Sequence, residues 1–533
     1  MTLAGIQFSF GCTNFLITRG ASTDGSTMIT YAADSHVLYG ELYFLPGQTY
    51  GSADSLIVYE WDTGYKLGKI KQAEKTYQVV GNMNEHQVAI GETTYTGRTE
   101  LQDTTGIIDY GSLMFIALQR AKSAREAIKL MGDLVAEYGY NSTGESFSIS
   151  DPDEVWIMEM IGKGVGNKGA VWVARRIPDG YISGHANQAR ITTFPLDDTV
   201  NCLYAEDVIS FAVDKGYYKG ELENFSFADA YAPLDFAGAR WCEARVWSGF
   251  RRVNKNMMQY EDYAMGENLH NRMPLWIKPD EKLSVKDVME LMRDYFQGTK
   301  MDMTKDIGAG PYECIVRWRP LDWEVDGVTY FNERAISTQQ TGFSFVAQSR
   351  NWLPDPIGGI FWFGVDDTYS TVYTPMYCGI NKIPKAFAVG NGSMMEFSDS
   401  SAFWIFNQVS NFAYTRYNEM IPYIRDKQSE IERKYMDETK GIDKKAKELF
   451  ENDQHLAIDL LTDYSVSAGN YTFTEWRKLY HFLFTRYMDG NIKTPVEGEQ
   501  NPKVEQPGYS ESWYRKIVEE TDDKFLYKGE TSH

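Results

Sequence analysis

Cys12 stands immediately before residues 13–18 (TNFLIT), a short run typical of a β-strand. A turn sequence over residues 20–25 and a second strand-like run over residues 27–32 follow it, which predicts a β-hairpin. Pairing in such a hairpin brings the start of the first strand beside the end of the second. We therefore expect the carboxylate of Asp34 to lie close to the thiol of Cys12.

A cysteine that becomes the first residue of its chain carries its own base. The α-amino group has a reference pKa of about 7.7 to 8.0, so an appreciable fraction of it is neutral near pH 7. It can accept the thiol proton directly or through water, and Asp34 can hold the resulting ammonium. Once residues 1–11 are removed, Cys12 would supply both the nucleophile and the base of an amide hydrolase.

Further short motifs follow the hairpin in a fixed order along the chain. With the hairpin, they occupy residues 12–14, 22–28, 33–35, 81–85, 91–93, 109–112, 144–147, 185–187, 245–247, 305–310 and 349–354. In this order residues 12–490 resemble the dipeptidase A type of cysteine peptidases, which are N-terminal-nucleophile hydrolases related to penicillin V acylase and conjugated bile acid hydrolase. The resemblance implies an α+β fold, an αββα sandwich of two antiparallel sheets between helix layers. It also implies hydrolysis of dipeptides or small peptides through a thioester, without a cofactor.

The same resemblance implies roles for individual residues. Cys12 corresponds to the nucleophile and Asp34 to the carboxylate that contacts its amino group. Asn187 corresponds to the asparagine that lines the catalytic site of the acylase relatives and helps to hold the nucleophile or the oxyanion. Asn84 and Glu92 are further candidates for oxyanion or substrate binding.

One position departs from the family pattern. The acylase relatives have an arginine three residues before the aspartate, where this chain has Tyr31. Tyr31 can form a hydrogen bond near the thiol. Without that arginine, the groups that could lower the thiol pKa are the ammonium of Cys12, backbone donors, or Arg245, which matches another arginine of the family. Tyr31 and Arg245 therefore join the candidate oxyanion or substrate-binding residues.

Composition and missing motifs exclude several other classes. The formal net charge is −21 and no basic cluster offsets it locally, so nucleic acid is not an expected partner. No apolar run is long enough to cross a bilayer. The five cysteines are scattered, and without Cys-x-x-Cys or His-x-x-x-His spacing no metal site is predicted. Residues 164–169 match Gly-x-Gly-x-x-Gly, but a strand-like run follows them, which predicts a hairpin loop.

Four segments are expected along the chain. Residues 1–11 end on small residues and indicate a signal-peptide remnant or a propeptide. They favour export to the periplasm or the exterior of a bacterium, with a cytoplasmic location as the alternative. Residues 12–398 would form the catalytic core with insertions, residues 399–490 a helical C-terminal segment, and residues 491–533 an extended tail.

Helical patterns are clearest in two parts of the chain. Ser123 and Glu126 fit a capping box that opens an amphipathic helix ending before Gly139. In the C-terminal segment, helices are expected over the ranges 399–416, 423–453 and 476–488, with Pro422 as a break between the first two.

Three alternative interpretations compete with the peptidase hypothesis. Taken alone, a cysteine before a strand is more often a buried core residue than a nucleophile. A non-peptide amide acylase of the penicillin V or bile-acid-amide type would use the same site. A binding protein of the same fold without turnover would need no free amine on Cys12. The sequence is compatible with a homo-oligomer and does not define one.

Overall fold

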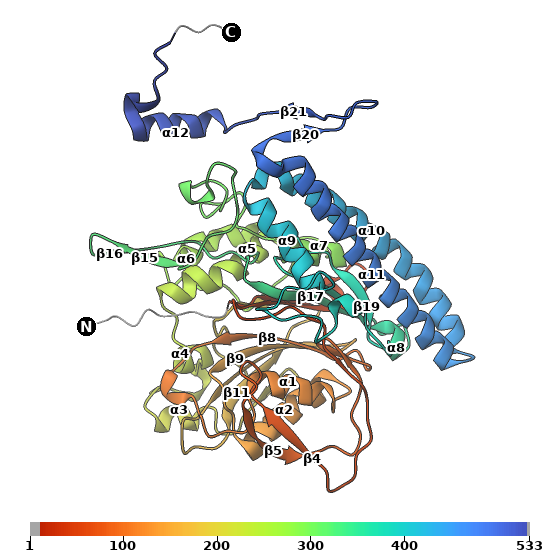
Figure 1. Ribbon diagram of the computed structural model, residues 1–533. Coiled ribbons are helices and arrows are strands. Elements are labelled where there is room, and N and C mark those ends of the chain that lie inside the picture. The colour runs from red at the N-terminus through yellow and green to blue at the C-terminus, as the bar shows by residue number, and fades with distance from the viewer. Residues whose placement is uncertain (1–10, 530–533) are drawn as a thin grey trace.

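The computed structural model describes residues 11–529. The leader predicted over residues 1–11 therefore lies, except for Gly11, outside the described residues. Two antiparallel sheets lie face to face between layers of helices, as Figure 1 shows. This arrangement is the αββα sandwich that the sequence predicts, so the expected α+β class is confirmed.

The first sheet carries the strand that follows Cys12. Within the described residues its order is β14-β12-β1-β2-β17-β18-β19, all antiparallel. Its strands are β1 (Asn14–Ile17), β2 (Thr27–Asp34), β12 (Ile182–His185), β14 (Trp276–Ile277), β17 (Thr341–Ser349), β18 (Ile360–Val365) and β19 (Thr374–Tyr377). Every residue of β2 is buried because helices cover one face of this sheet and the second sheet covers the other.

The second sheet has the order β13-β11-β10-β9-β8-β7-β6-β3. Its strands are β3 (Phe44–Leu45), β6 (Val79–Val80), β7 (Met83–Asn84), β8 (Ala89–Tyr95), β9 (Gly144–Ser150), β10 (Val155–Gly162), β11 (Ala170–Arg176) and β13 (Cys202–Tyr204). Residues 164–169 connect β10 to β11, so the glycine-rich match is a hairpin loop, as predicted. Strands β8 and β9 lie against β2 of the first sheet, which places residues of both sheets around one site.

The predicted N-terminal hairpin is confirmed. Leu16 pairs with Ile29 in β1 and β2, and an isolated bridge joins Thr13 to Ala32. The next main-chain contact outward is a hydrogen bond of 3.0 Å from the N–H of Gly11 to the carbonyl oxygen of Asp34. The start of the first strand and the end of the second therefore lie side by side.

Helices α1 (Tyr110–Leu118) and α2 (Ala124–Tyr138) cover the outer face of the second sheet (Figure 1). The side chain of Ser123 accepts a hydrogen bond from the N–H of Glu126, and Gly139 ends α2 at φ 81°, as predicted. The carboxylate of Glu126 accepts from the N–H of Lys122, so only the Ser123 half of the predicted capping box is formed. Shorter helices lie in the connections: α3 (Ser210–Asp214), α4 (Phe227–Tyr231), α5 (Ala244–Val253), α6 (Glu261–Ala264), α7 (Val285–Leu291) and α8 (Asp355–Gly358).

Three long helices cover the first sheet: α9 (Ala402–Tyr414), α10 (Tyr417–Phe450) and α11 (Gln454–Tyr487). The predicted break at Pro422 is wrong, because this proline lies inside α10, and the chain breaks just before Tyr417. A proline so near the start of a helix removes one intrahelical hydrogen bond. The helix predicted over residues 476–488 is the end of α11, whose earlier part contains Gly469 and many β-branched residues and is stabilised by packing on α10 and β19.

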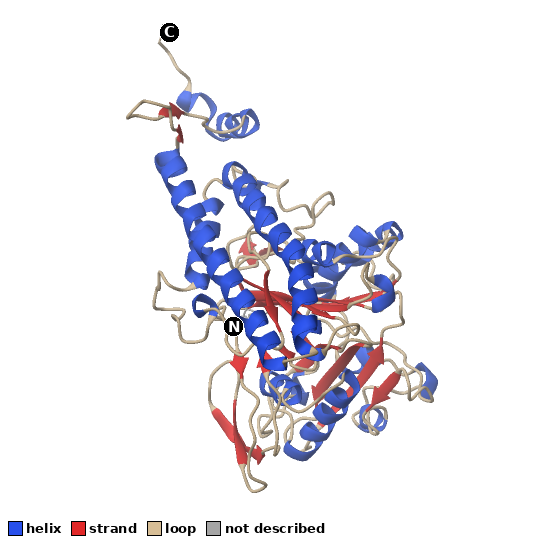
Figure 2. Cartoon of the chain, turned by 90° about the vertical axis from the view of Figure 1, so that its right-hand side faces the viewer, coloured by secondary structure: helices blue, strands red, loops and turns tan. Residues whose placement is uncertain are grey.

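The C-terminal tail differs from the extended chain that its prolines suggested. It forms the pair β20 (Ile492–Thr494) and β21 (Lys503–Glu505) and then α12 (Glu511–Thr521), which project beyond the long helices (Figure 2). Two other exposed hairpins are β4 (Ser55–Tyr59) with β5 (Lys66–Lys71), and β15 (Asp322–Val325) with β16 (Val328–Phe331). Among the described residues, no helix combines the length and the apolar character that a bilayer crossing needs.

Candidate active site

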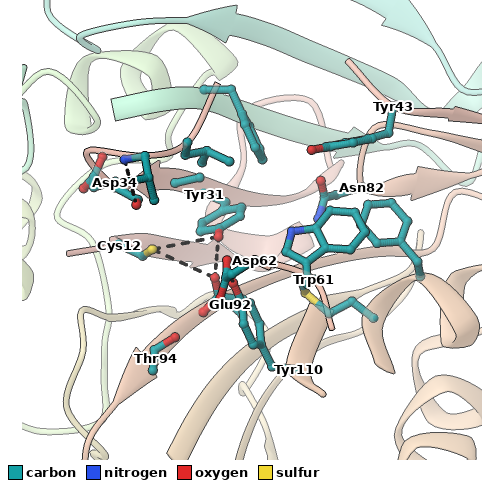
Figure 3. A pocket seen from close by; sticks show the side chains of 17 residues that line it. Cys12, Tyr31, Asp34, Tyr43, Trp61, Asp62, Asn82, Glu92, Thr94 and Tyr110 are labelled. Atoms are coloured by element: carbon teal, nitrogen blue, oxygen red, sulfur yellow. Dashed lines mark hydrogen bonds between the residues drawn. The ribbon is translucent and has the colours of Figure 1, made fainter. Parts of the chain in front are cut away.

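Cys12 lies at the wall of a cavity of about 90 Å³ between the two sheets (Figure 3). The cavity is lined by Cys12, Tyr31, Ala33, Asp34, Ser35, Val37, Leu38, Tyr43, Trp61, Asp62, Asn82, Glu92, Thr94, Tyr110, Met114, Phe115 and Phe343. A second cavity of about 880 Å³ shares Asp62, Thr94 and Tyr110 with it. The thiol therefore faces a narrow space that continues into a wider one.

The thiol, the Tyr31 hydroxyl and the Glu92 carboxyl meet at this wall (Figure 3). Sγ of Cys12 lies 3.8 Å from Oη of Tyr31 and 3.9 Å from Oε1 of Glu92, within the range of hydrogen bonds donated by a thiol. The Tyr31 hydroxyl also donates a short hydrogen bond to Oε1 of Glu92. Tyr31 comes from β2 and Glu92 from β8, so the two sheets together form this group.

The charge state of the thiol depends on these neighbours. Burial raises the pKa of Cys12 well above its ordinary value, and the nearby carboxylates of Glu92 and Asp34 raise it further. The hydrogen bond with Tyr31 acts in the opposite direction. In the chain that still carries Gly11, the thiol is therefore held in its neutral form.

Asp34 lies beside Cys12, as the hairpin predicts, but its carboxylate binds other groups. Its Oδ2 is 2.6 Å from Nη2 of Arg334, and its Oδ1 accepts a hydrogen bond of 2.6 Å from the hydroxyl of Thr341. Burial raises the pKa of Asp34 although the charge of Arg334 opposes that shift. The carboxylate of Asp34 is thus already bound by two side chains near the main chain of Cys12.

Two arginines hold the peptide segment around the Gly11–Cys12 bond. Nη2 of Arg334 donates a very short hydrogen bond to the carbonyl oxygen of Gly11, and Nη1 of Arg245 approaches the same oxygen at 3.2 Å. Arg245 also donates to the carbonyl oxygen of Cys12 at 2.5 Å and to the hydroxyl of Thr13 at 2.8 Å. Arg245 stands at the start of α5, just after a π-helical stretch, Gly238–Glu243.

Arg245 therefore binds the main chain around Cys12 and, among the described residues, makes no hydrogen bond to the thiol of Cys12. Burial, and then the charge of Arg334, lower the pKa of Arg245 to about 10. Both guanidinium groups converge on the carbonyl oxygen of the bond that would have to be cut.

The two predicted asparagines lie in different surroundings. Oδ1 of Asn187 accepts a hydrogen bond of 2.8 Å from Arg245, and its Nδ2 donates one of 2.5 Å to the carbonyl oxygen of Thr94. Asn187 is therefore connected to the main chain of Cys12 through Arg245. Asn84 points away from the cavity: its amide donates to the carbonyl oxygens of Leu118 and Ala121, at 2.8 Å each. Asn82, two residues earlier, lines the cavity instead.

No histidine is found among the residues that line the two cavities in the described part of the chain. The buried His185 bonds to the hydroxyls of Thr93 and Ser148 at 2.7 Å each, and burial lowers its pKa to about 3. It is therefore a neutral structural residue. Within residues 11–529, no cluster of three or more His, Cys, Asp or Glu side chains could hold a metal ion.

Aromatic side chains form the wall opposite the thiol. Trp61 stacks on Phe115 with ring centroids 4.6 Å apart, and Tyr43 packs on Trp61 at 5.1 Å. Figure 3 shows Tyr43 and Trp61 across the cavity from Cys12. This wall can accommodate an apolar side chain of a substrate.

Several residues of the site were not among the sequence candidates. Arg334 and Asp62 lie in regions without a recognised motif, whereas Asn82 and Glu145 belong to the motifs at residues 81–85 and 144–147. Glu145 lies in strand β9, every residue of which is buried, and a glutamate is costly to bury there unless it has a role.

Comparison with known proteins gives a consistent family. Residues 45–430 match the model of Peptidase family C69. The chain is 26% identical to the "Probable dipeptidase" of Latilactobacillus sakei over 391 residues, which cover 70% of this chain and 76% of that protein. It is 25% identical to the "Probable dipeptidase" of Salmonella dublin, covering 71% and 84%, and 24% identical to "Dipeptidase A" of Lactobacillus helveticus, covering 76% and 82%.

Proposed function

The chain belongs to peptidase family C69 and hydrolyses peptide bonds, and from this we propose that it is a dipeptidase whose nucleophile is Cys12 with a free α-amine. The observation that carries the proposal is the position of the Cys12 thiol at the cavity wall, at the end of the hairpin and beside Asp34. The family match begins after Cys12, so the assignment of the nucleophile depends on this geometry.

In the proposed reaction, removal of residues 1–11 converts the amide nitrogen of Cys12 into an amine. The amine takes the thiol proton, and the sulfur attacks the carbonyl carbon of the substrate's peptide bond. The tetrahedral intermediate collapses by breaking the C–N bond, and the ammonium of Cys12 protonates the leaving amine. Water, activated by the same amine, then hydrolyses the thioester and restores the thiol.

The surroundings of Cys12 support this choice of base. No described histidine lines either cavity, whereas a free amine on Cys12 would lie between Asp34 and the thiol that it deprotonates. The negative charge of Asp34 favours the ammonium form of the Cys12 amine, whereas the positive charge of Arg334 disfavours it. The hydrogen bond from Arg245 to the carbonyl oxygen of Cys12 would hold the nucleophile in place during acylation and during hydrolysis of the thioester.

Dipeptides or small peptides are the proposed substrates, and the protein is proposed to be exported. The chain itself is proposed to cut the Gly11–Cys12 bond, because Arg334 and Arg245 bind the carbonyl oxygen of that bond. The test combines intact mass with hydrolysis of leucyl-leucine before and after alkylation of thiols. A chain that starts at Cys12 and loses activity on alkylation or in Cys12→Ala supports the proposal. A chain that still begins at Met1 and hydrolyses the dipeptide at the normal rate contradicts it. Hydrolysis of penicillin V but not of dipeptides would support the acylase alternative.

A further inference from the structure

The two cavities carry negative charge without a basic side chain to balance it. Their carboxylates are Asp34, Asp62 and Glu92 in the smaller cavity, and Glu60, Asp62, Glu145 and Asp235 in the larger one. No lysine, arginine or histidine is among the described lining residues of either cavity. Arg334 pairs with Asp34 and balances its charge. Glu92 has no such basic partner, and its carboxylate lies 3.9 Å from the thiol of Cys12.

Glu92 and Glu145 are both buried and incompletely bonded. Their relative exposures are 1% and 0%, and Oε2 of Glu92 and both oxygens of Glu145 lack a hydrogen-bond donor among the described residues. The two carboxyl groups interact with each other across β8 and β9. If Glu145 is protonated, its hydroxyl can donate a hydrogen bond to Glu92. The other unpaired carboxyl oxygens of the pair would still lack a donor, which is costly for buried polar atoms.

The distance from the thiol to Glu92 matches the dimensions of an amino acid residue. In a residue with a free amine, the nitrogen lies two bonds, or about 2.5 Å, from the carbonyl carbon. Attack requires the sulfur about 3 to 3.5 Å from that carbon. The ammonium group of the N-terminal residue, which carries the attacked carbonyl and becomes the acyl group of the thioester, therefore lies about 3 to 6 Å from Sγ of Cys12. Oε1 of Glu92 lies 3.9 Å from the same sulfur.

We propose that Glu92, supported by Glu145, binds the free α-ammonium group of the substrate, so that the enzyme selects peptides with an unblocked N-terminus and rejects N-acylated ones. This inference rests on the proposed function, because it takes Cys12 as the nucleophile. It goes further by assigning the specificity to two named carboxyl groups.

The enzyme's own terminal amine does not occupy this position. The nitrogen of Cys12 is bonded to the carbonyl carbon of Gly11, whose oxygen is held by Arg334 and Arg245. A freed amine therefore lies on the side of Asp34 and the two arginines, while the sulfur faces Glu92 and Tyr31. The two cations, one from the enzyme and one from the substrate, have separate carboxylates.

The charge of Glu92 is sensitive to pH in the working range. Burial raises the pKa of Glu92 to about 7, while hydrogen bonds from Glu145 and Tyr31 oppose the shift. Burial, and then the charge of Glu92, raise the pKa of Glu145 well above its ordinary value, which favours the protonated form that can donate to Glu92. The ammonium site is thus complete only where Glu92 is ionised, above about pH 7.

The first test compares alanyl-leucine with N-acetyl-alanyl-leucine on the mature wild-type enzyme and on Glu92→Gln. Wild type should favour the free amine by at least about 100-fold in kcat/KM, and Glu92→Gln should lose most of that preference through a higher KM. N-acetyl-lysyl-leucine, whose only cation is on the side chain, should remain a poor substrate. Equal use of the free and acetylated peptides would overturn the inference while leaving the dipeptidase function intact. Failure of both peptides to react, with Cys12 not acylated, would instead reject the proposed function.

The second test uses two variants of Glu145 that differ in hydrogen bonding. For wild type, KM for alanyl-leucine should rise as the pH falls below about 7, because Glu92 becomes protonated. Glu145→Leu removes the hydrogen bond to Glu92 and should move this rise to higher pH. Glu145→Gln can still donate and should keep the wild-type profile. Identical profiles for the two variants would overturn the role of Glu145, since a purely structural effect would change folding and not the pH midpoint of KM.

Discussion

Nη2 of Arg334 lies 2.6 Å from Oδ2 of Asp34, and both side chains are almost fully buried, 300 residues apart in the sequence. The same guanidinium bonds to the carbonyl oxygen of Gly11. One contact therefore joins the carboxylate beside the nucleophile to the peptide bond that precedes it.

Arg334→Gln removes the charged partner of a buried carboxylate and should lower the free energy of unfolding by about 3 kcal/mol. Because the variant also loses a donor to the carbonyl oxygen of Gly11, a smaller fraction of the protein should begin at Cys12. Urea unfolding and intact mass measure the two effects. In the double variant with Asp34→Asn, the stability loss should be clearly smaller than the sum of the two single losses; strict additivity would argue against the pair.

Gly11→Ala should slow the removal of residues 1–11. A Cβ atom at this position would lie 2.3 Å from Nη2 of Arg334, which would displace the guanidinium from the carbonyl oxygen. Signal peptidases accept alanine at such positions, so a signal peptidase would cut this variant normally. A time course of intact mass after synthesis measures the rate. Gly441→Ala is the matched control, because a Cβ atom there meets nothing within 4 Å; equal rates in both variants would contradict a cleavage that depends on Arg334.

Substitutions at Glu92 and Tyr31 should move the thiol pKa in opposite directions. Glu92→Gln removes a neighbouring negative charge and should lower the pKa of Cys12, whereas Tyr31→Phe removes a stabilising hydrogen bond and should raise it. The pH dependence of Cys12 alkylation by iodoacetamide, followed by peptide mass, reports the midpoint in each variant. Shifts in the same direction would show that these contacts do not control the thiol.

Asp366→Asn should stabilise the protein most at alkaline pH. Asp366 is buried, its oxygens have no hydrogen-bond partner among the described residues, and burial followed by the charge of Asp367 raises its pKa to about 8 from 3.8. Since the folded state holds this proton more tightly than the unfolded state, wild type loses stability as the pH rises from about 4 to about 8. The loss is at most about 1.4 kcal/mol per pH unit.

Thermal unfolding of Asp366→Asn and wild type at pH 5 and pH 8 tests this linkage, and the stability gap should be wider at pH 8. Asparagine tolerates the φ of 71° found at Asp366, so the backbone should accept the substitution. Asp522→Asn, at an exposed aspartate that also has a positive φ, corrects for effects of the substitution itself. If the difference in stability between the two proteins is the same at both pH values, Asp366 does not carry the proton whose loss destabilises the wild type.

The sequence predicted the parts of the site that depend on nearby residues. Cys12 and Asp34 are brought together by one hairpin, whose turn and strand signals lie within 25 residues. The partners that complete the site come from far along the chain: Glu92 from the facing sheet, and Arg334 from the loop before β17. Periodicity and turn chemistry say nothing about which distant side chains two stacked sheets bring together. Glu92 was therefore a candidate only through the family resemblance, and Arg334 was not a candidate at all.

The same reason explains the errors in the C-terminal helices. Pro422 and the polar stretch around Gly469 both argue locally against continuous helix. Packing against a neighbouring helix and against β19 outweighs these local costs. Gly469 allows α11 to approach Pro384 closely, because a Cβ atom at position 469 would lie only 2.3 Å from Cγ of that proline. Local propensity is a weak guide where tertiary contacts supply most of the stability.

Arg245 holds the carbonyl oxygen of Cys12 and the hydroxyl of Thr13, both of which stay on the chain after cleavage at Gly11. New chain ends ordinarily fray, because they lose the covalent neighbour that ordered them. Here Arg245 binds atoms on the C-terminal side of the cleaved bond, so the new N-terminus would remain bound in place after cleavage. In the proposed mechanism, ordering the nucleophile therefore costs no additional entropy when residues 1–11 are removed, and each turnover begins from the same geometry.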